Sequence, residues 1–341
     1  MFSLSFLLIL TIVSIAGYLI TPDHTPFCND QILEIRLLKP GSKVTFLKVK
    51  KNKEVEQHSL WHKMLFGQEN PYLLVPINSY SIKGDTVIVN QYQNCDTSQT
   101  GLFQISDLYS EKSFIVNKKF LLGTDKYGRD LLSQIIIGAR VSLSIGFISI
   151  CIALIIGIFL GACSGYFGGK TDDLISWFIN VVWSVPTLLL VIAISFVLGT
   201  GFWQVFIAIG LTMWVDIARV VRGQFVSYKE KDYVESSKSM GFRNFTIMFK
   251  HILPNINGTL MVITASNFAS AILMEAGLSF LGIGVQSPMP SWGKMIKENY
   301  GYLILDYAYL AIIPGIAIVL LVLAFMLIGN TLRDVMDVKD L

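Results

Sequence analysis

Long uncharged hydrophobic runs dominate the pattern of this chain. A helix needs about 20 residues to cross the roughly 30 Å of hydrocarbon in a bilayer, and most of the runs reach that length. The pattern therefore predicts six transmembrane helices, of which the fourth is the shortest. The runs cover residues 2–22, 144–163, 178–198, 199–215, 252–274 and 307–332.

The first run differs from a cleaved signal peptide in two ways. It lacks a basic N-terminal region, and its apolar stretch is longer than the usual stretch of about 7–15 residues. We therefore interpret residues 2–22 as an anchor that stays in the protein.

The composition agrees with a membrane protein. Hydrophobic residues make up 53% of the 341 residues and charged residues only 15%, whereas an average soluble domain is about 25% charged. These values exclude a disordered chain, a fibrous repeat and an ordinary soluble enzyme. The net charge of +3 is too small to indicate a nucleic-acid partner, so the expected surroundings are the lipid membrane and other proteins.

Positive residues indicate how the chain is oriented. The segment 219–251 carries seven Lys and Arg residues, and the turn between the third and fourth runs carries none. Since Lys and Arg in short loops mark the cytoplasmic side, we place 219–251 in the cytoplasm. Six spans then put both termini in the cytoplasm and residues 23–119 outside it. That segment is basic, but long segments are translocated largely regardless of their charge.

Residues 23–119 have strand patterns. Residues 43–50 read KVTFLKVK and residues 85–92 read DTVIVNQY, and Gly41 and Gly84 precede them where turns are expected. We therefore predict a small β-rich extracytoplasmic domain inserted after the first helix. Cys28 and Cys95 both fall in this domain, where an oxidising compartment would allow a disulfide. Two free thiols are the alternative that the sequence leaves open.

No motif for catalysis or metal binding is found. The four cysteines form no CxxC pair, and HExxH and GxSxG are absent. The phosphate loop GxxxxGK[ST] is absent too, because the fragment GGKT at 168–171 has the wrong spacing. We expect a chain that is not an enzyme, with no catalytic residue, no metal ligand and no cofactor of its own.

The cytoplasmic segment is the most informative part of the sequence. It reads as a helix, a glycine break at Gly241 that suits a left-handed C-cap, and a second helix that stops near Pro254. The small Ser236 and Ser237 beside the acidic Glu235 are compatible with a docking helix, and a solvated basic loop is the alternative. The second helix carries an apolar stripe of Phe242, Phe245, Ile247, Phe249 and Ile252.

This segment resembles the EAA-x(3)-G-x(9)-I-x-L-P signature of ABC importer permeases. Glu235 holds the place of the acid and Gly241 that of the glycine, and serines replace both alanines. From about residue 121 to 338 the chain is similar to the C-type permeases of dipeptide and oligopeptide importers. The motifs, in family order, are LGTDKYGRDLLS (122–133), GARVSL (138–143), GYFGG (165–169), RVVRGQ (219–224), EAGLSFLG (275–282), PSWG (290–293) and LRD (332–334).

The resemblance implies an all-α polytopic membrane protein with six transmembrane helices in the type I ABC importer fold, here with the β-rich domain inserted. It implies a second permease subunit in a heterodimer, two separate ATPases that bind ATP and Mg, and an extracytoplasmic substrate-binding protein. The location would be the bacterial inner membrane. Di- or oligopeptides would be the cargo, and nickel, other metal chelates or glycosides remain alternatives.

The resemblance also implies two sets of site residues. The residues that would couple the chain to an ATPase are Tyr233, Glu235, Ser236, Ser237, Gly241, Leu253 and Pro254. The residues of an outer-face motif are Gly123, Thr124, Asp125, Gly128, Arg129 and Asp130, with Asp125 expected to cap a helix.

The expected organisation has five parts. The transmembrane domain contains the coupling loop 219–251, and the long segment after the first helix has no counterpart in the family. The parts are a first helix (1–22), the inserted domain (23–119), an outer interfacial segment (120–135), the permease domain (136–332) and a cytoplasmic tail (333–341).

Overall fold

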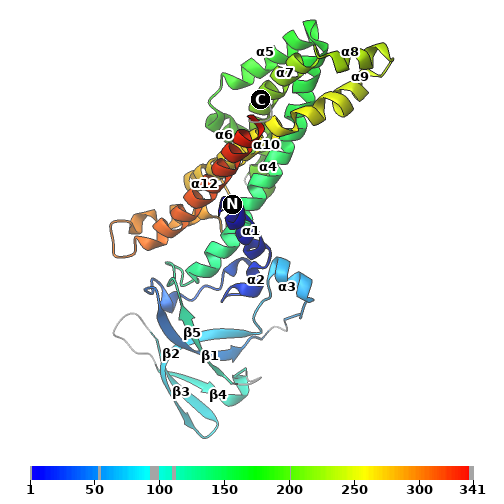
Figure 1. Cartoon of the computed structure of the whole chain (residues 1–341). Coiled ribbons are helices and arrows are strands. Elements are labelled where there is room, and N and C mark those ends of the chain that lie inside the picture. Colours follow the sequence, from blue (N-terminus) through cyan, green and yellow to red (C-terminus); the bar gives the residue numbers. More distant parts are fainter. Residues whose placement is uncertain (1, 53–54, 93–99, 110–112, 200, 338–341) are drawn as a thin grey trace. The chain divides into compact units, whose positions relative to one another are not determined.

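The computed structural model describes residues 2–52, 55–92, 100–109, 113–199 and 201–337 (Figure 1). The chain divides into two compact units. We call residues 10–141 and 287–315 the sheet unit, and residues 1–9, 142–286 and 316–341 the helical unit.

The sheet unit contains a five-stranded antiparallel sheet in the order β4-β3-β2-β1-β5 (Figure 1). The strands predicted at 43–50 and 85–92 are confirmed as β1 and β3. Gly41 and Gly84 adopt φ angles of +84° and +61°, as the predicted turns require. The strands are β1 (Ser42–Lys50), β2 (Tyr72–Lys83), β3 (Thr86–Gln91), β4 (Thr100–Gln104) and β5 (Ile115–Phe120).

Both faces of this sheet are covered by apolar side chains. On one face Phe46 packs with Leu74, Phe120 and the apolar side chains of the segment 32–38. On the other face Leu47 belongs to a second cluster that extends across β2 and β3. Strand β1 is therefore a buried inner strand, which fits its pairing with β2 on one side and β5 on the other.

The sheet unit also contains short helices. One of them, α11, places Trp292 so that its indole Nε1 donates to the carbonyl of Ile135 at 2.9 Å. A Cβ on Gly138 would lie only 2.9 Å from the same ring, so glycine allows this contact. These elements are α2 (Gly17–Ile20), η1 (Pro26–Cys28), η2 (Leu33–Ile35), α3 (Leu60–Phe66), η3 (Ile105–Asp107), α11 (Trp292–Asn299) and η6 (Tyr300–Tyr302).

The rest of the structure is helical. Three helices, α1, α4 and α12, have residues in both units. The helices are α1 (Phe2–Ile15), α4 (Leu131–Phe167), α5 (Gly169–Trp183), α6 (Thr187–Leu198), α7 (Phe202–Tyr228), α8 (Asp232–Ser239), α9 (Asn244–Thr246), η4 (Ile247–Ile252), η5 (Leu253–Ile256), α10 (Asn257–Leu281) and α12 (Tyr309–Asp337).

Four helices in the described part of the chain are long and apolar enough to cross a membrane. The bent pair α5 and α6 would make a fifth span, and α1 is shorter than a full span. The count of six spans therefore stays a prediction. The four are Leu131–Phe167, Phe202–Tyr228, Asn244–Leu281 and Tyr309–Val335.

The third predicted span is sharply bent in the structure. The run 178–198 begins inside α5 and ends with α6, and the two helices meet at 91°. Pro186 stands at the junction as the residue before α6. Proline lacks an N–H and disfavours helical geometry at the residue before it, so the helix breaks there, although hydropathy stays high on both sides.

A glycine series on α4 lets α7 approach closely within the helical unit. A Cβ on Gly157 would lie 2.8 Å from the carbonyl oxygen of Trp214, and one on Gly161 would lie 2.5 Å from that of Ala218. Gly165 continues the series one turn later, against the carbonyl of Arg222. Small residues four apart allow this approach between membrane helices, and here they serve packing within the chain.

Candidate functional site

Helix α8 has clear start and stop signals. Asp232 and Glu235 lie in its first turn, where negative charge is favoured, and Lys238 lies in its last turn. After the helix, Gly241 adopts φ +76° and its N–H donates to the carbonyl of Lys238 at 2.9 Å. The N–H of Phe242 then reaches back to Ser237 at 3.2 Å. The predicted left-handed cap at Gly241 is therefore confirmed.

The faces of α8 differ strongly in exposure. Val234 and Ser237 are buried against the protein, whereas Glu235 and Ser236 are exposed. The hydroxyl of Ser237 donates to the carbonyl of Tyr233 at 2.8 Å, so the buried face keeps no unpaired hydroxyl. A small side chain is needed at 237 for packing, while position 236 is free to meet a partner.

An apolar surface is exposed around the turn that follows α8. Met240, Phe245 and Phe242 are 69%, 57% and 45% exposed. The predicted stripe is thus divided, because Ile247 and Ile252 are fully buried whereas its phenylalanines are exposed. We call the exposed group the α8 patch: Tyr233, Glu235, Met240, Phe242, Phe245 and Phe249. Exposed apolar side chains beside polar ones are typical of interaction sites.

Hydrogen bonds fix this turn to longer helices. The hydroxyl of Tyr166 on α4 lies 3.1 Å from Oδ1 of Asn244, and the ammonium of Lys238 lies over the Tyr166 ring at 5.5 Å. Nδ2 of Asn255 donates to the carbonyl of His251 at 2.6 Å and to the hydroxyl of Tyr233 at 3.4 Å. Partial burial raises the pKa of Tyr233, so its hydroxyl stays protonated.

Predicted site residues Leu253 and Pro254 form the start of η5, which continues into α10. They follow η4, a π-helical turn that contacts α8. π-turns within helices are often found at functional sites. Helix α8 is therefore connected to α10 through η4, which it contacts, and through η5, which continues into α10.

An ion pair that the sequence did not reveal holds α5 to α7. The guanidinium of Arg222 donates to both carboxylate oxygens of Asp172 at 2.6 Å, and Ser164 and Ser176 donate to the same carboxylate. The two residues are separated by 50 positions, so helical spacing gave no signal. A bidentate pair of this kind constrains orientation as well as distance.

The outer-face motif forms a tight turn in the sheet unit. Gly123 and Gly128 have φ of +80° and +76°, and a Cβ on Gly128 would lie 1.8 Å from the carbonyl oxygen of Ile32. The hydroxyl of Thr124 donates to Ile35 at 2.5 Å and accepts from the N–H of Leu38 at 2.9 Å. The motif therefore binds the segment that covers one face of the sheet.

The two aspartates of the motif cap different elements. Asp125 caps the turn, because its Oδ1 accepts the N–H groups of Tyr127 and Arg129 at 2.9 Å. Asp130 caps α4, because its Oδ2 accepts the N–H and the hydroxyl of Ser133. The expectation that Asp125 caps a helix was wrong, because the residues after it form a turn with Gly128 at φ +76° and α4 begins only at Leu131.

Arg129 is the centre of a buried ion cluster. It contacts Asp125 at 2.6 Å and Glu298 at 2.7 Å, and its side chain is only 6% exposed. Burial alone would lower the pKa of Arg129, but the two carboxylates outweigh it and raise the pKa. Glu298 lies 169 residues away in the sequence, so no spacing rule could have found it.

Cys28 is a free, buried cysteine whose thiol donates to the carbonyl of Asp23 at 3.1 Å. Burial raises the pKa of this thiol, with Asp23 adding to the effect. Cys95, its predicted partner, lies outside the described residues, as do the last residues of the tail. The bridge between the two cysteines stays a prediction.

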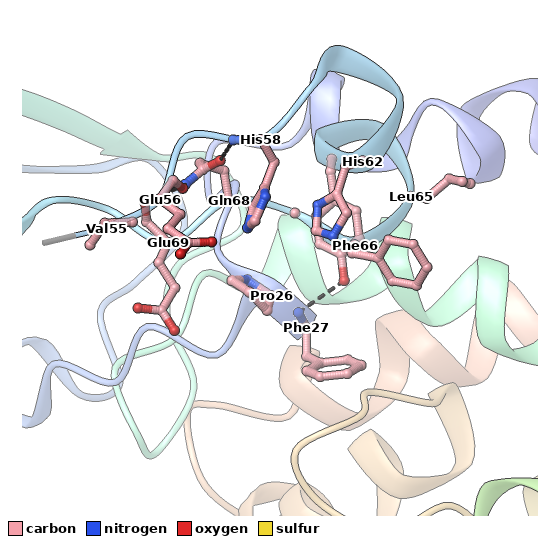
Figure 2. Close-up of a pocket in the computed structure, with 12 residues that line it drawn as sticks. Pro26, Phe27, Val55, Glu56, His58, His62, Leu65, Phe66, Gln68 and Glu69 are labelled. Atoms are coloured by element: carbon pink, nitrogen blue, oxygen red, sulfur yellow. Dashed lines mark hydrogen bonds between the residues drawn. The ribbon is translucent and has the colours of Figure 1, made fainter.

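A cavity of about 490 Å³ lies beside α3 in the sheet unit (Figure 2). His58 and His62 face it with their rings 4.1 Å apart, and Phe27 and Phe66 form an apolar wall. Among the described residues, no three His, Cys, Asp or Glu side chains are grouped to hold a metal ion.

The family model and the similar proteins that match this chain all describe membrane components of transport systems. Residues 134–339 match the family model of binding-protein-dependent transport system inner membrane components. The dipeptide transport system permease protein DppC of Lactococcus lactis is 37% identical over 72% of this chain and 71% of that protein. The glutathione transport system permease protein GsiD of Pectobacterium atrosepticum is 39% identical over 64% of this chain and 72% of that protein.

A solved structure is similar in fold alone. A chain of the MetNI methionine ABC transporter in inward-facing conformations matches with a TM-score of 0.50 and 19% identity. The match covers 60% of this chain and 97% of that chain.

Proposed function

Since the chain belongs to the family of binding-protein-dependent transport system inner membrane components, we propose that it is a permease subunit that carries di- or oligopeptides across the bacterial inner membrane. The relatives named for dipeptide and glutathione transport support this cargo. Membership of the family implies an ATPase and a substrate-binding protein as partners. ATP and Mg would be bound by the ATPase, and this chain would be a transport subunit rather than an enzyme.

The observation that carries the proposal is the α8 patch. Its aromatic side chains are exposed at the end of a helix that is firmly attached to the longer helices. Aromatic anchors in a polar surround are the usual centres of protein–protein interfaces. The patch would insert into a groove of the ATPase, with Phe242 and Phe245 as apolar anchors and Glu235 facing a basic or hydroxyl group.

The contacts behind the patch explain how force would reach the membrane. When the ATPases close, α8 would move and carry η4, η5 and α10 with it, because Val234 and Ser237 pack inward and Leu253 and Pro254 continue the chain. The Asp172–Arg222 pair would keep α5 and α7 moving as one body. The result is rigid-body alternating access between inward-open and outward-open states, driven by contacts that differ between these states.

The assembly that fits this role contains two ATPases, a second and different permease subunit and one extracytoplasmic binding protein. Both termini of this chain would be cytoplasmic, and the inserted domain 23–119 extracytoplasmic. The motif from Gly123 to Asp130 would help form the outer face that meets the binding protein. Its tight turn and its Arg129 cluster support a rigid platform there.

Co-purification tests the proposal directly. The complex is extracted in mild detergent through a tag on this chain, and its companions are identified by mass spectrometry. The expected companions are an ATPase with a phosphate loop and a second permease. Isolation of this chain without any ATPase, even after crosslinking, would contradict the proposed function.

Point variants then test the patch. Glu235→Lys and Phe245→Ser should each reduce the ATPase recovered by at least about tenfold, the loss expected when an interface anchor is removed. Glu34→Lys is the matched control, because Glu34 is an exposed acid in the sheet unit. Equal recovery from all three variants would show that the patch does not hold the ATPase.

A further inference from the structure

Helix α3 exposes an unusual amount of apolar surface for its length. It has seven residues, LWHKMLF, and none of them is buried. Leu60 is 76% exposed, Trp61 73% and Leu65 48%. At 100° per residue these three side chains and Met64 lie within an arc of about 140°. His62, Lys63 and Phe66 lie on the other side, and Phe66 is 61% exposed. The helix therefore has one continuous apolar face that the described chain leaves largely uncovered.

Arg140 fixes the position of this helix. Its guanidinium donates four hydrogen bonds, to the carbonyls of Ser14 and Ile15 at 2.8 Å each and to those of Leu65 and Met64 at 2.7 and 3.0 Å. One side chain on α4 thus binds the C-terminal carbonyls of both α1 and α3. Those carbonyls have no partner within their own helices, so the clamp is specific to this arrangement.

The clamp ties the end of α3 to Arg140, which is the one charged residue of α4. The residues that follow it carry no charge from Val141 to Gly169, so Arg140 stands at one end of the uncharged run. This run is longer than the about 20 helical residues that cross the hydrocarbon. Arg140 and the end of α3 are therefore expected outside the hydrocarbon, at the level of the lipid headgroups.

We propose that α3 lies in the lipid–water interface, with Leu60, Trp61 and Leu65 inserted among the upper acyl chains. Tryptophan is enriched at this level, and short amphipathic helices with this pattern lie flat in it. Helix α1, whose last carbonyls share the Arg140 clamp, also exposes apolar side chains, with Ile12 and Ile15 56% and 52% exposed. The neighbouring cavity is compatible with this level, because His58, His62, Glu56 and Glu69 give its lining polar groups that lipid headgroups and water could contact (Figure 2).

The proposal gives part of the inserted segment a role. Helix α3 lies between β1 and β2, so its contact with the membrane would anchor the sheet to the lipid surface. This inference rests on the location of the chain in a membrane and does not depend on its cargo or on the α8 patch.

Photocrosslinking from position 61 tests the proposal. The photoreactive amino acid p-benzoylphenylalanine replaces Trp61 in the tagged full chain, the purified complex is placed in phospholipid nanodiscs, and adducts formed under ultraviolet light are identified by mass spectrometry. Two matched positions serve as controls. Phe147, 65% exposed in the apolar run of α4, should react with lipid. Leu102, 69% exposed on the edge strand β4, lies four strands from β5 and should not.

The expected result is a phospholipid adduct at positions 61 and 147 and none at 102. Adducts at 147 alone, or a protein adduct at 61, would overturn the proposal and assign α3 to water or to a partner subunit. Position 60 provides a second probe in case the variant at 61 does not assemble, and the same outcomes apply to it.

Discussion

Removing the guanidinium of Arg129 should destabilise the sheet unit by an amount that the structure allows us to work out. In Arg129→Ala, the carboxylate of Asp125, which is 1% exposed, loses its cation but keeps two backbone N–H donors. Glu298, 17% exposed, keeps only Lys294 at 4.0 Å. Breaking a buried ion pair from one side costs about 3–5 kcal/mol, and the remaining donors favour the lower end, about 3 kcal/mol.

This loss should be visible as a lower unfolding temperature. A unit of this size loses roughly 2–4 °C per kcal/mol, so the expected decrease is roughly 6–12 °C. Cys28 is a suitable reporter, because it is fully buried and its thiol pKa is raised by burial. A thiol-reactive dye would label it only when the sheet unit opens, in a chain whose other cysteines are replaced by alanine.

Two further variants serve as comparisons for Arg129→Ala. Arg129→Lys keeps the positive charge but loses the planar guanidinium that reaches both carboxylates. Its unfolding temperature should therefore decrease less than that of Arg129→Ala. Lys43→Ala removes an exposed cation of β1 and should change the free energy of unfolding by less than about 0.5 kcal/mol. If Arg129→Ala unfolds within about 1 °C of Lys43→Ala, the cluster does not stabilise the unit and the reasoning fails.

Three other predictions can be checked on the purified complex. Gly161→Leu should destabilise the helical unit by about 1–3 kcal/mol because of its contact with Ala218, whereas Gly223→Ala, which has open space, should be neutral or stabilising in thermal unfolding. Burial raises the pKa of Asp130, so its charged form is disfavoured in the folded state, and this contribution to stability falls as pH rises above the unfolded pKa. Asp130→Asn keeps the cap and should unfold at a higher temperature than wild type at pH 7.5, with a smaller difference near pH 4. Gly241→Val should reduce ATP hydrolysis by the assembled complex and Gly241→Asn should largely preserve it, because asparagine tolerates φ +76°.

Several features could be predicted from local sequence because local chemistry decides them. Alternating residues gave β1 and β3, and the positive φ angles of Gly41, Gly84 and Gly241 followed from turn and cap positions. The family was recognisable from ordered motifs. By contrast, the run 178–198 was predicted as one span from its hydropathy, which is high on both sides of Pro186 and does not reveal the 91° bend there.

The sequence by itself determined that this is a membrane protein with long apolar helices, a strand-forming segment after the first helix and a helix–glycine–helix segment of the permease type. Each of these depends on composition or on residues within a few positions of one another. Only the tertiary structure decided the pairing of Arg129 with Glu298 and of Arg222 with Asp172, the clamp made by Arg140, and which members of the apolar stripe after Gly241 are exposed or buried. These depend on contacts between residues far apart in the chain, where direction and burial are set by packing and leave no periodic signal in the sequence.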